Sequence, residues 1–358
     1  MTNTQLRNRA TLNWLSNASH ALDRAAEEAA IARQATLTKP PGSLGRLEEL
    51  AIWLSARQGK AIPMVAAPSV AVFAGDHGVA KRGVSAFPPE VTGQMVANFA
   101  AGGAAICVLS REAGAHFEVV DVGTRLTSHP KGVIVDRIAH GSSDMVEGPA
   151  LSADELAHAL NAGRRAVQRA QQRGADLLVL GEMGIGNTTA ASAVSASLLG
   201  LCGEALAGPG TGLDPAGVAS KALIVDQAIR ANGLTLGSDP LDVLAAVGGH
   251  ELAALTGAYL SAAELGLPVV VDGFICSASA LVAARVRPDC AHWMLGSHTS
   301  AEPGHQLILA ELDMHPVLDL GLRLGEGSGA GALLPILKIA CALHGSMATF
   351  AEAGVAEA

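Results

Sequence analysis

One pattern constrains the fold more than any other, and it recurs five times after about residue 68. A short run of apolar, often β-branched residues ends in Gly or Asp with polar residues, and an Ala-rich stretch of helical character follows. The instances are 69–78, 116–124, 176–187, 267–274 and 291–300. Short, continuously apolar strands that alternate with helices are typical of a parallel sheet covered on both faces. We therefore predict an α/β, Rossmann-like fold with a mostly parallel sheet flanked by helices.

The ends of these five strands indicate where a ligand binds. In open parallel sheets, ligands lie beyond the carboxyl ends of the strands, and here every end carries Gly with Asp, Glu, His, Ser or Thr. The 41 glycines of the chain cluster beside such polar residues, which suits backbone that approaches ligands closely. We expect a single site assembled from all five connections.

The two ends of the chain have a different character. Leu12, Leu15, Ala18, Leu22 and Ala25 recur at helical spacing, a second helix is expected over 44–59, and 333–350 is again rich in Ala and Leu. We predict a small helical domain formed by 1–62 together with 335–358, and a large α/β domain over 63–334 that carries the site.

Charge and cysteine usage narrow the functional classes. The formal net charge is −9, and no stretch collects basic residues, which argues against a nucleic-acid partner. The segment 1–14 lacks the apolar core of a signal peptide. Two apolar segments do not suit a membrane span: 188–203 is short and rich in Ser and Thr, and 241–263 contains His250 and Glu251. Five cysteines without C-x-x-C spacing fit reduced thiols. We expect a soluble, cytoplasmic protein without membrane contact.

The segment GEMGIGNTTAASA (181–193) is the strongest local signal for a ligand. A strand runs into a Gly-rich turn that opens a helix, and the free N–H groups of a helix start bind anions. The spacing matches neither a Walker loop nor a complete dinucleotide fingerprint. A plain strand–helix turn with a capping Asn remains an alternative, although an acid beside a phosphate site suits ribose hydroxyls. The candidate residues are Glu182, Gly184, Gly186, Asn187 and Thr188.

Two further segments carry candidates for the same anionic ligand. GPGTGLD (208–214) contributes Gly210 and Gly212 and precedes a helix with Lys221, which either reaches an anion or is merely solvated. GSHTSAEPGH (296–305) contributes Ser297 and Thr299, as part of a polar loop for phosphate or ribose. A metal site formed by its two histidines and its glutamate is disfavoured, because Pro-Gly breaks the helix that would align them. We expect no metal and no cofactor.

A pocket for a flat ring is expected in the segment 85–95. Pro88, Pro89 and Glu90 predict a helix start, which leaves the preceding residues in a loop over the sheet. An apolar ring with polar atoms at its edge would stack there, although core packing of Phe87 and Met95 is an equal alternative. The candidates for this pocket are Ser85, Phe87, Pro88, Gln94 and Met95.

LGEGSGAGA (324–332) holds Glu326 between two glycines. A glutamate in a glycine loop is usually solvated and without a role. Here its flanks are apolar, at 320–324 and 330–336, which would desolvate the acid and raise its pKa toward that of a useful base.

Taken in order, these segments resemble the nicotinate-nucleotide–dimethylbenzimidazole phosphoribosyltransferase family over nearly the whole chain. The motifs that carry the resemblance are TKPPGSLGRLE (38–48), FAGDHGV (73–79), VSAFPPEVTGQMV (84–96), GEMGIGNTTAA (181–191), GPGTGLD (208–214), VGGHE (247–251), VVDGF (270–274), GSHTSAEPGH (296–305) and LGEGSGAGA (324–332).

The resemblance implies nicotinate mononucleotide as phosphoribosyl donor, 5,6-dimethylbenzimidazole as acceptor, and a homodimer. It implies Glu326 as the catalytic base, the segments around Glu182, Lys221 and Ser297 as the nucleotide site, and the residues of 85–95 together with Leu324 as the base pocket. The expected effect of Glu326→Gln is slow turnover with nucleotide binding retained. The alternatives from other classes are a nucleotide-dependent oxidoreductase, a non-catalytic nucleotide-binding sensor, and a metal hydrolase at His298, Glu302 and His305.

Overall fold

The computed structural model describes residues 11–356, so most of the segment 1–14 lies outside the described residues. Within 11–356, six strands form one sheet with the order β3-β2-β1-β4-β5-β6, and every neighbouring pair is parallel. The strands are β1 (Pro68–Gly75), β2 (His116–Gly123), β3 (Ile134–Val135), β4 (Leu177–Met183), β5 (Val269–Val271) and β6 (Met294–Gly296). This is the strand order of doubly wound Rossmann folds, so the predicted fold class is confirmed.

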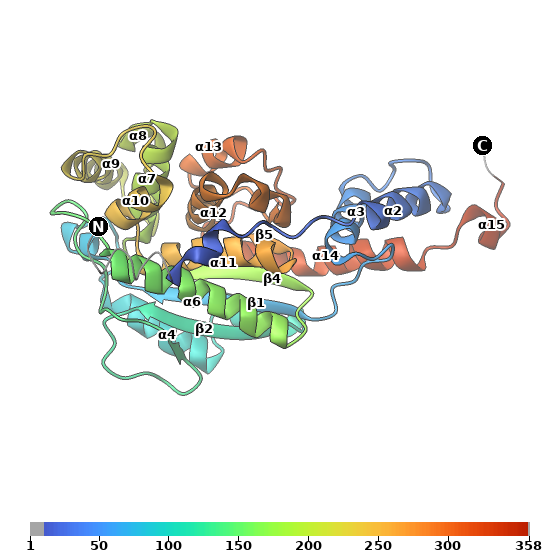
Figure 1. Cartoon of the computed structure of the whole chain (residues 1–358), viewed down its shortest axis with the longest axis horizontal. Helices are drawn as coiled ribbons and strands as arrows, with labels where there is room; N and C mark the ends of the chain where they lie inside the picture. The colour runs from blue at the N-terminus through green and yellow to red at the C-terminus, as the bar shows by residue number, and fades with distance from the viewer. Residues whose placement is uncertain (1–10, 357–358) are drawn as a thin grey trace.

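Helices cover both faces of this sheet (Figure 1). The longer ones are α2 (Arg24–Thr36), α3 (Arg46–Gln58), α4 (Glu90–Ala101), α5 (Ala105–Glu112), α6 (Ala153–Gln172), α7 (Asn187–Leu199), α9 (Pro215–Ala231), α10 (Pro240–Val247), α11 (His250–Leu265), α12 (Phe274–Val286), α13 (Gly304–Glu311) and α14 (Ser328–Ser346). The shorter ones are α8 (Gly203–Leu206), α15 (Phe350–Ala353) and the 3-10 turns η1 (Asn13–Ser16), η2 (Gly78–Arg82) and η3 (Pro288–Trp293).

The alternating side chains of the strands build two apolar cores. On β1, Ala71 and Phe73 point into a core shared with α6, α7, α11 and α12. Val70 and Val72 point to the opposite face, into a core shared with α3, α5 and α14. Because both faces are buried, the strands read as continuous apolar runs in the sequence.

Helices α6 and α11 lie unusually close on the first face, and two glycines permit this. A Cβ at Gly163 would lie 1.8 Å from the carbonyl oxygen of Ala254, and one at Gly257 would lie 2.1 Å from that of Leu160. Both obstacles are backbone atoms of the facing helix, so only separation of the helices would relieve the overlap.

We therefore expect Gly163→Ala to lower the free energy of unfolding by about 3 kcal/mol, the upper end of usual overpacking costs. Denaturant unfolding measures this. Gly345→Ala in α14 is the control, because its Cβ would meet only Ile62 Cγ2, at 3.0 Å. Ile62 is half exposed and can move, so the control should match or slightly exceed the wild type. Equal stability of both variants would contradict the close-packing account.

The two ends of the chain contact each other. Arg33 of α2 donates to the carbonyl of His344 at 2.7 Å, and Gln34 Nε2 lies 2.8 Å from His344 Nδ1. Figure 1 shows α2, α3 and the far half of α14 extending together from the sheet. Helix α14 runs through the expected boundary at 334/335. The division into a small helical domain (1–62 with 335–358) and a large one stays a prediction.

The prediction of a first helix from the apolar spacing of residues 12–25 is wrong. Residues 17–23 are not helical; η1 precedes them, and α2 begins only at Arg24, where Asp23 caps it by accepting from the N–H of Ala26. The apolar residues Leu12, Leu15 and Leu22 pack against the first core. Their spacing reflects contacts of an irregular segment with the body of the protein, not a helix. The second expected helix is confirmed as α3.

Two segments, Glu90–Glu112 and Ser328–Ser346, are long and apolar enough to cross a membrane by length and composition alone. The first is interrupted at Gly102, where α4 ends with a left-handed residue. The second is α14, which packs in the second core. A core helix passes the same test, so neither segment carries an argument for a membrane.

Candidate active site

Glu326 lies in a turn of unusual backbone geometry at the start of α14. Gly325, Glu326 and Gly327 have φ of 83°, 65° and 83°. Such values suit glycine but cost a glutamate free energy. The turn presses against β4, where a Cβ at Gly181 would lie 2.3 Å from the carbonyl oxygen of Glu326. Surrounding structure that holds a side chain in a strained conformation is typical of functional sites.

Two carboxylates from neighbouring strands hold this turn. Glu182 Oε1, at the end of β4, accepts from the N–H of Glu326 at 3.3 Å, and its other oxygen accepts from the side-chain amide of Asn187. Asp272, directly after β5, accepts from the N–H groups of Gly327 at 3.2 Å and Ala330 at 2.9 Å.

Burial sets the proton affinity of the carboxyl groups. It raises the pKa of Glu326 to about 7, with a further contribution from the charge of Asp272. Burial also raises the pKa of Glu182 to about 8, assisted by Asp272 and Glu251. The predicted direction for Glu326 is confirmed, but the expected cause is only partly right: Leu320 and Leu324 are 63% and 60% exposed. Packing against β4 contributes to the burial of the acid instead.

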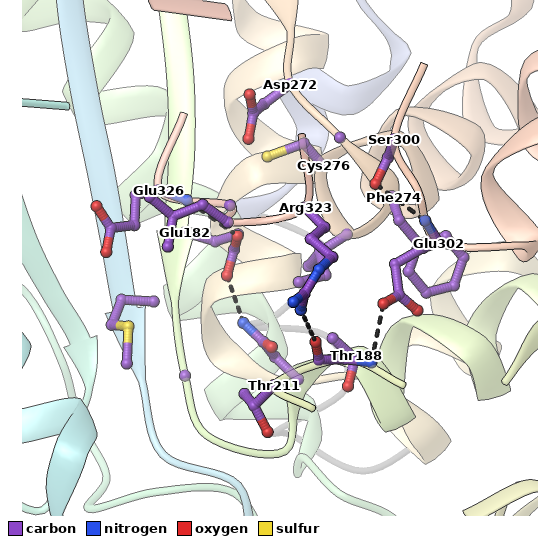
Figure 2. Close-up of a pocket in the computed structure, with 18 of the residues that line it drawn as sticks. Glu182, Thr188, Thr211, Asp272, Phe274, Cys276, Ser300, Glu302, Arg323 and Glu326 are labelled. Carbon is purple, nitrogen blue, oxygen red and sulfur yellow. Dashed lines mark hydrogen bonds between the residues drawn. The ribbon is translucent and has the colours of Figure 1, made fainter. Parts of the chain in front are cut away.

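A cavity of about 630 Å³ opens in front of Glu326 (Figure 2). Three of the five strand ends line it, through Glu182 at the end of β4, Asp272 after β5, and His298 with Ser300 after β6. The loop and helix that follow β1 add Phe87, Val91 and Met95. The cavity is mostly apolar, with convergent polar groups, as expected of a site for a small molecule.

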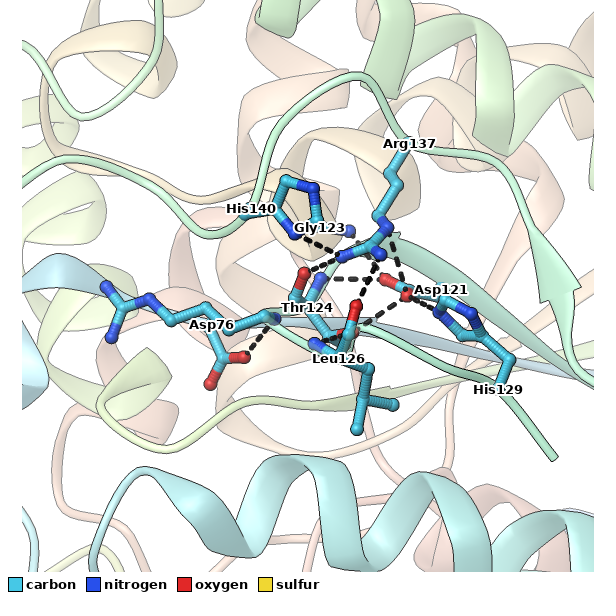
Figure 3. A network of polar contacts seen from close by, with 9 residues as sticks. Asp76, Asp121, Gly123, Thr124, Leu126, His129, Arg137 and His140 are labelled. Carbon is cyan, nitrogen blue, oxygen red and sulfur yellow. Dashed lines mark hydrogen bonds and ion pairs between the residues drawn. The ribbon is translucent and has the colours of Figure 1, made fainter.

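The end of β2 does not reach this cavity, which corrects the expectation of five contributing strand ends. Asp121 is fully buried and accepts from the N–H groups of Gly123 and Thr124, and it also pairs with His129 and Arg137 (Figure 3). Its carboxylate is occupied in organising the loop that follows β2.

Comparison with known proteins decides the family. A family model described as "Phosphoribosyltransferase" matches residues 19–355. The nicotinate-nucleotide–dimethylbenzimidazole phosphoribosyltransferase of Azotobacter vinelandii is 53% identical over 348 residues, 97% of this chain and 99% of that protein. The chain belongs to this family of phosphoribosyltransferases. A crystal structure of the enzyme of the same name from Thermus thermophilus matches with a TM-score of 0.88 and 44% identity, over 94% of this chain and 100% of that chain.

Five of the nucleotide candidates suggested by the resemblance to this family line the cavity. They are Glu182, Gly184, Asn187, Thr188 and Gly210. The remaining candidates are adjacent to it but do not line it: Gly186, Gly212, Lys221 and Ser297.

Lys221 does not line the cavity itself but contacts Thr188, which does. Its ammonium group is buried and donates to Thr188 Oγ1 at 2.7 Å and to the carbonyl of Gly208 at 3.1 Å. Burial lowers the pKa of this lysine to about 8, while the charge of Glu302 opposes the shift. Ser297 is likewise fully buried, with its hydroxyl 2.9 Å from His298 Nδ1.

Of the base-pocket candidates, some line the cavity and others do not. Phe87, Met95 and Leu324 line the cavity, and Phe87 is 52% exposed, so the core-packing alternative does not hold for it. Ser85, Pro88 and Gln94 do not line the cavity. The Ser85 hydroxyl instead lies 2.9 Å from that of Thr211, which ties the loop before α4 to the GPGTG segment.

The histidines considered for a metal have other partners. His305 Nε2 lies 2.9 Å from Ser277 Oγ, and its Nδ1 accepts from the N–H of Ser300 at 3.0 Å. Glu302 accepts from the N–H of Gly210 at 2.8 Å. Among residues 11–356, no group of three or more His, Cys, Asp or Glu is arranged to hold a metal ion.

Sequence reasoning missed four polar residues of the cavity: Thr211, Asp272, Ser300 and Arg323. Asp272 carried a signal, because it ends a predicted strand within VVDGF. Arg323 is three residues before Glu326, and its guanidinium donates to the carbonyl of Gly210 at 3.5 Å (Figure 2). A lone Arg beside a glycine loop gave no pattern that would have singled it out.

Proposed function

We propose that this protein transfers the 5-phosphoribosyl group of nicotinate mononucleotide to 5,6-dimethylbenzimidazole, with inversion at C1′. The products are α-ribazole 5′-phosphate and nicotinate, and the reaction serves assembly of the nucleotide loop of cobalamin. The observation that carries the proposal is Glu326: it lines the cavity, its pKa is raised to about 7, and its Oε2 is buried without a hydrogen-bond partner. Family membership supplies the substrates.

One base is enough for this reaction. The donor carries nicotinate through a positively charged pyridinium nitrogen, so nicotinate departs neutral at that nitrogen and takes up no proton. The acceptor attacks C1′ with its unprotonated ring nitrogen, which makes the N–H of its other nitrogen acidic. Glu326 removes that proton, and its free Oε2 is available to receive it. The remaining work is positioning of two flat rings about the ribose.

The resemblance to this family supplies the other roles. The donor's phosphate and ribose lie against Glu182, Gly184, Asn187, Thr188 and Gly210, supported from behind by Gly186, Gly212, Lys221 and Ser297. The acceptor lies between Phe87, Met95 and Leu324, with Ser85, Pro88 and Gln94 shaping the loop and helix that carry this side. No cofactor or metal takes part.

We further propose a soluble, cytoplasmic homodimer. The resemblance to this family supports the homodimer. Sedimentation of the purified protein tests this, and a monomer at micromolar concentration would contradict it.

The decisive assay uses purified protein with nicotinate mononucleotide and a panel of bases, with products identified by mass. We expect nicotinate and a ribazole phosphate in equal amounts, and no loss of activity with a chelator. Nicotinate release only with a base present distinguishes an enzyme from a sensor. Absorbance change with reduced nicotinamide cofactors, without ribazole, would favour the oxidoreductase instead.

The pH dependence of kcat/KM gives an independent test. Glu326 acts as a carboxylate, so kcat/KM should fall about tenfold per pH unit below a midpoint near 7, the raised pKa of this residue, and level off above it. Acceptors that titrate at different pH serve as the control. If the pH midpoint of kcat/KM changes with the pKa of the acceptor, the pH profile no longer supports Glu326 as the base.

A further inference from the structure

The backbone conformation of the turn Gly325–Gly327 is intrinsically unfavourable, so contacts from outside the turn have to stabilise it. Three consecutive residues have positive φ, and the central one is a glutamate with a full side chain. A left-handed glutamate is held only where its surroundings determine it. The direction in which the Glu326 carboxylate points therefore depends on the groups that grip the N–H groups of this turn.

Two carboxylates do so, and they differ in what else they contact. Glu182 binds the N–H of Glu326 and the side chain of Asn187. Asp272 is 2% exposed, and both of its oxygens are taken by backbone N–H groups, Oδ2 by Gly327 and Oδ1 by Ala330. Asp272 thus grips the turn on the side of α14, from the neighbouring strand β5.

We propose, on the basis of the function proposed above, that Asp272 is a positioning residue that holds the turn Gly325–Gly327 and thereby fixes the direction of the Glu326 carboxylate. It does not touch the reacting atoms. Gly327 is the N-cap residue of α14 and Ala330 lies in the first turn of that helix, so Asp272 caps α14. Because Gly327 is also the last residue of the strained turn, the same carboxylate holds the turn.

The charges around Glu326 agree with this role. The carboxylate of Asp272 adds to burial in raising the pKa of Glu326. Glu182 at the end of β4 also contacts this turn, and the charge of Glu326 helps to raise the pKa of the Cys107 thiol on α5. His298 Nδ1 lies 3.9 Å from Asp272 Oδ1 and opposes the rise that burial causes in the pKa of Asp272.

Asp272→Asn tests the proposal, because asparagine has the same shape but only one acceptor oxygen and no charge. We expect kcat to fall at least about tenfold, since loosened geometry is costly in a positioned reaction. The KM for nicotinate mononucleotide should stay within about threefold of the wild type, since the donor-binding groups are untouched. The acid limb of the pH profile should move to lower pH, because a negative neighbour of Glu326 is lost.

Asp76→Asn is the matched control. Asp76 is also a buried carboxylate after a strand, and it accepts from the N–H of Arg125 at 2.7 Å, but it does not line the cavity. It should lose thermal stability while keeping kcat and the pH profile. If Asp272→Asn behaves in the same way, Asp272 only caps a helix and the proposal is overturned.

Asp272→Glu separates position from charge and serves if the asparagine variant does not fold. It keeps the charge but moves the carboxylate by one methylene, so kcat should fall with the acid limb unmoved; wild-type kcat would refute the positioning role. The wild type is assayed first with the same substrates. An inactive wild type would contradict the proposed function itself, whereas an active wild type with unaffected Asp272 variants would contradict only this inference.

Discussion

Replacing Glu326 with glutamine is expected to lower kcat by about a thousandfold, within the range that a single general base contributes. The side chain keeps its shape and its place in the turn, but the amide cannot take the acceptor's proton. The KM for nicotinate mononucleotide should stay within about twofold, because proton removal belongs to the transition state and not to donor binding. Steady-state kinetics with product analysis by mass provides the measurement.

Glu326→Asp is the matched control for this variant. Aspartate tolerates positive φ better than most residues, so the turn should form, and the carboxylate is only withdrawn by one methylene. We expect intermediate activity, with the pH profile still limited by a carboxyl group. Near-wild-type turnover of the glutamine variant would rule out Glu326 as the base, whatever the aspartate variant does.

The strands were predictable because each leaves a strong local trace. Buried parallel strands read as apolar runs, and β1, β2, β4, β5 and β6 all lie within the predicted segments or within one residue of them. β3 was missed because two residues, Ile134 and Val135, form no pattern. The helical spacing of residues 12–25 misled, because apolar residues of an irregular segment fit the same period by packing on the core.

The site was predictable in its residue types but not in its connections. Glu326, Glu182 and Thr188 were identified and do line one cavity. Their partnership was hidden, because a hydrogen bond such as that from the N–H of Glu326 to Glu182 joins residues 144 positions apart. Asp121 shows the reverse problem: it lies at the end of a strand much as Asp272 does, yet it serves its own loop, and no local pattern distinguishes the two.

The interpretation of the glycine clusters was incomplete, and a substitution at Gly181 tests the role of one of these glycines. Glycine clusters were interpreted as places where backbone approaches a ligand. At Gly181 the approaching group is instead the turn Gly325–Gly327: a Cβ there would lie 2.3 Å from the carbonyl oxygen of Glu326, 2.4 Å from its carbonyl carbon and 2.7 Å from the nitrogen of Gly327. All three are backbone atoms, so the turn has to move by about 1 Å to reach ordinary contact distance.

We therefore expect Gly181→Ala to lower kcat by about a hundredfold, the usual cost of misplacing a reacting group by about 1 Å. Stability should fall by only about 2 kcal/mol, and kcat is measured well below the melting temperature. Gly296→Ala is the control: Gly296 also ends a strand, but its Cβ would meet nothing nearer than 3.5 Å, so kcat should be retained. A Gly181→Ala enzyme with kcat within twofold of the wild type would mean that the position of Glu326 does not depend on this contact. The loss of turnover in a folded variant would instead tie the base's activity to a glycine that never meets the substrate.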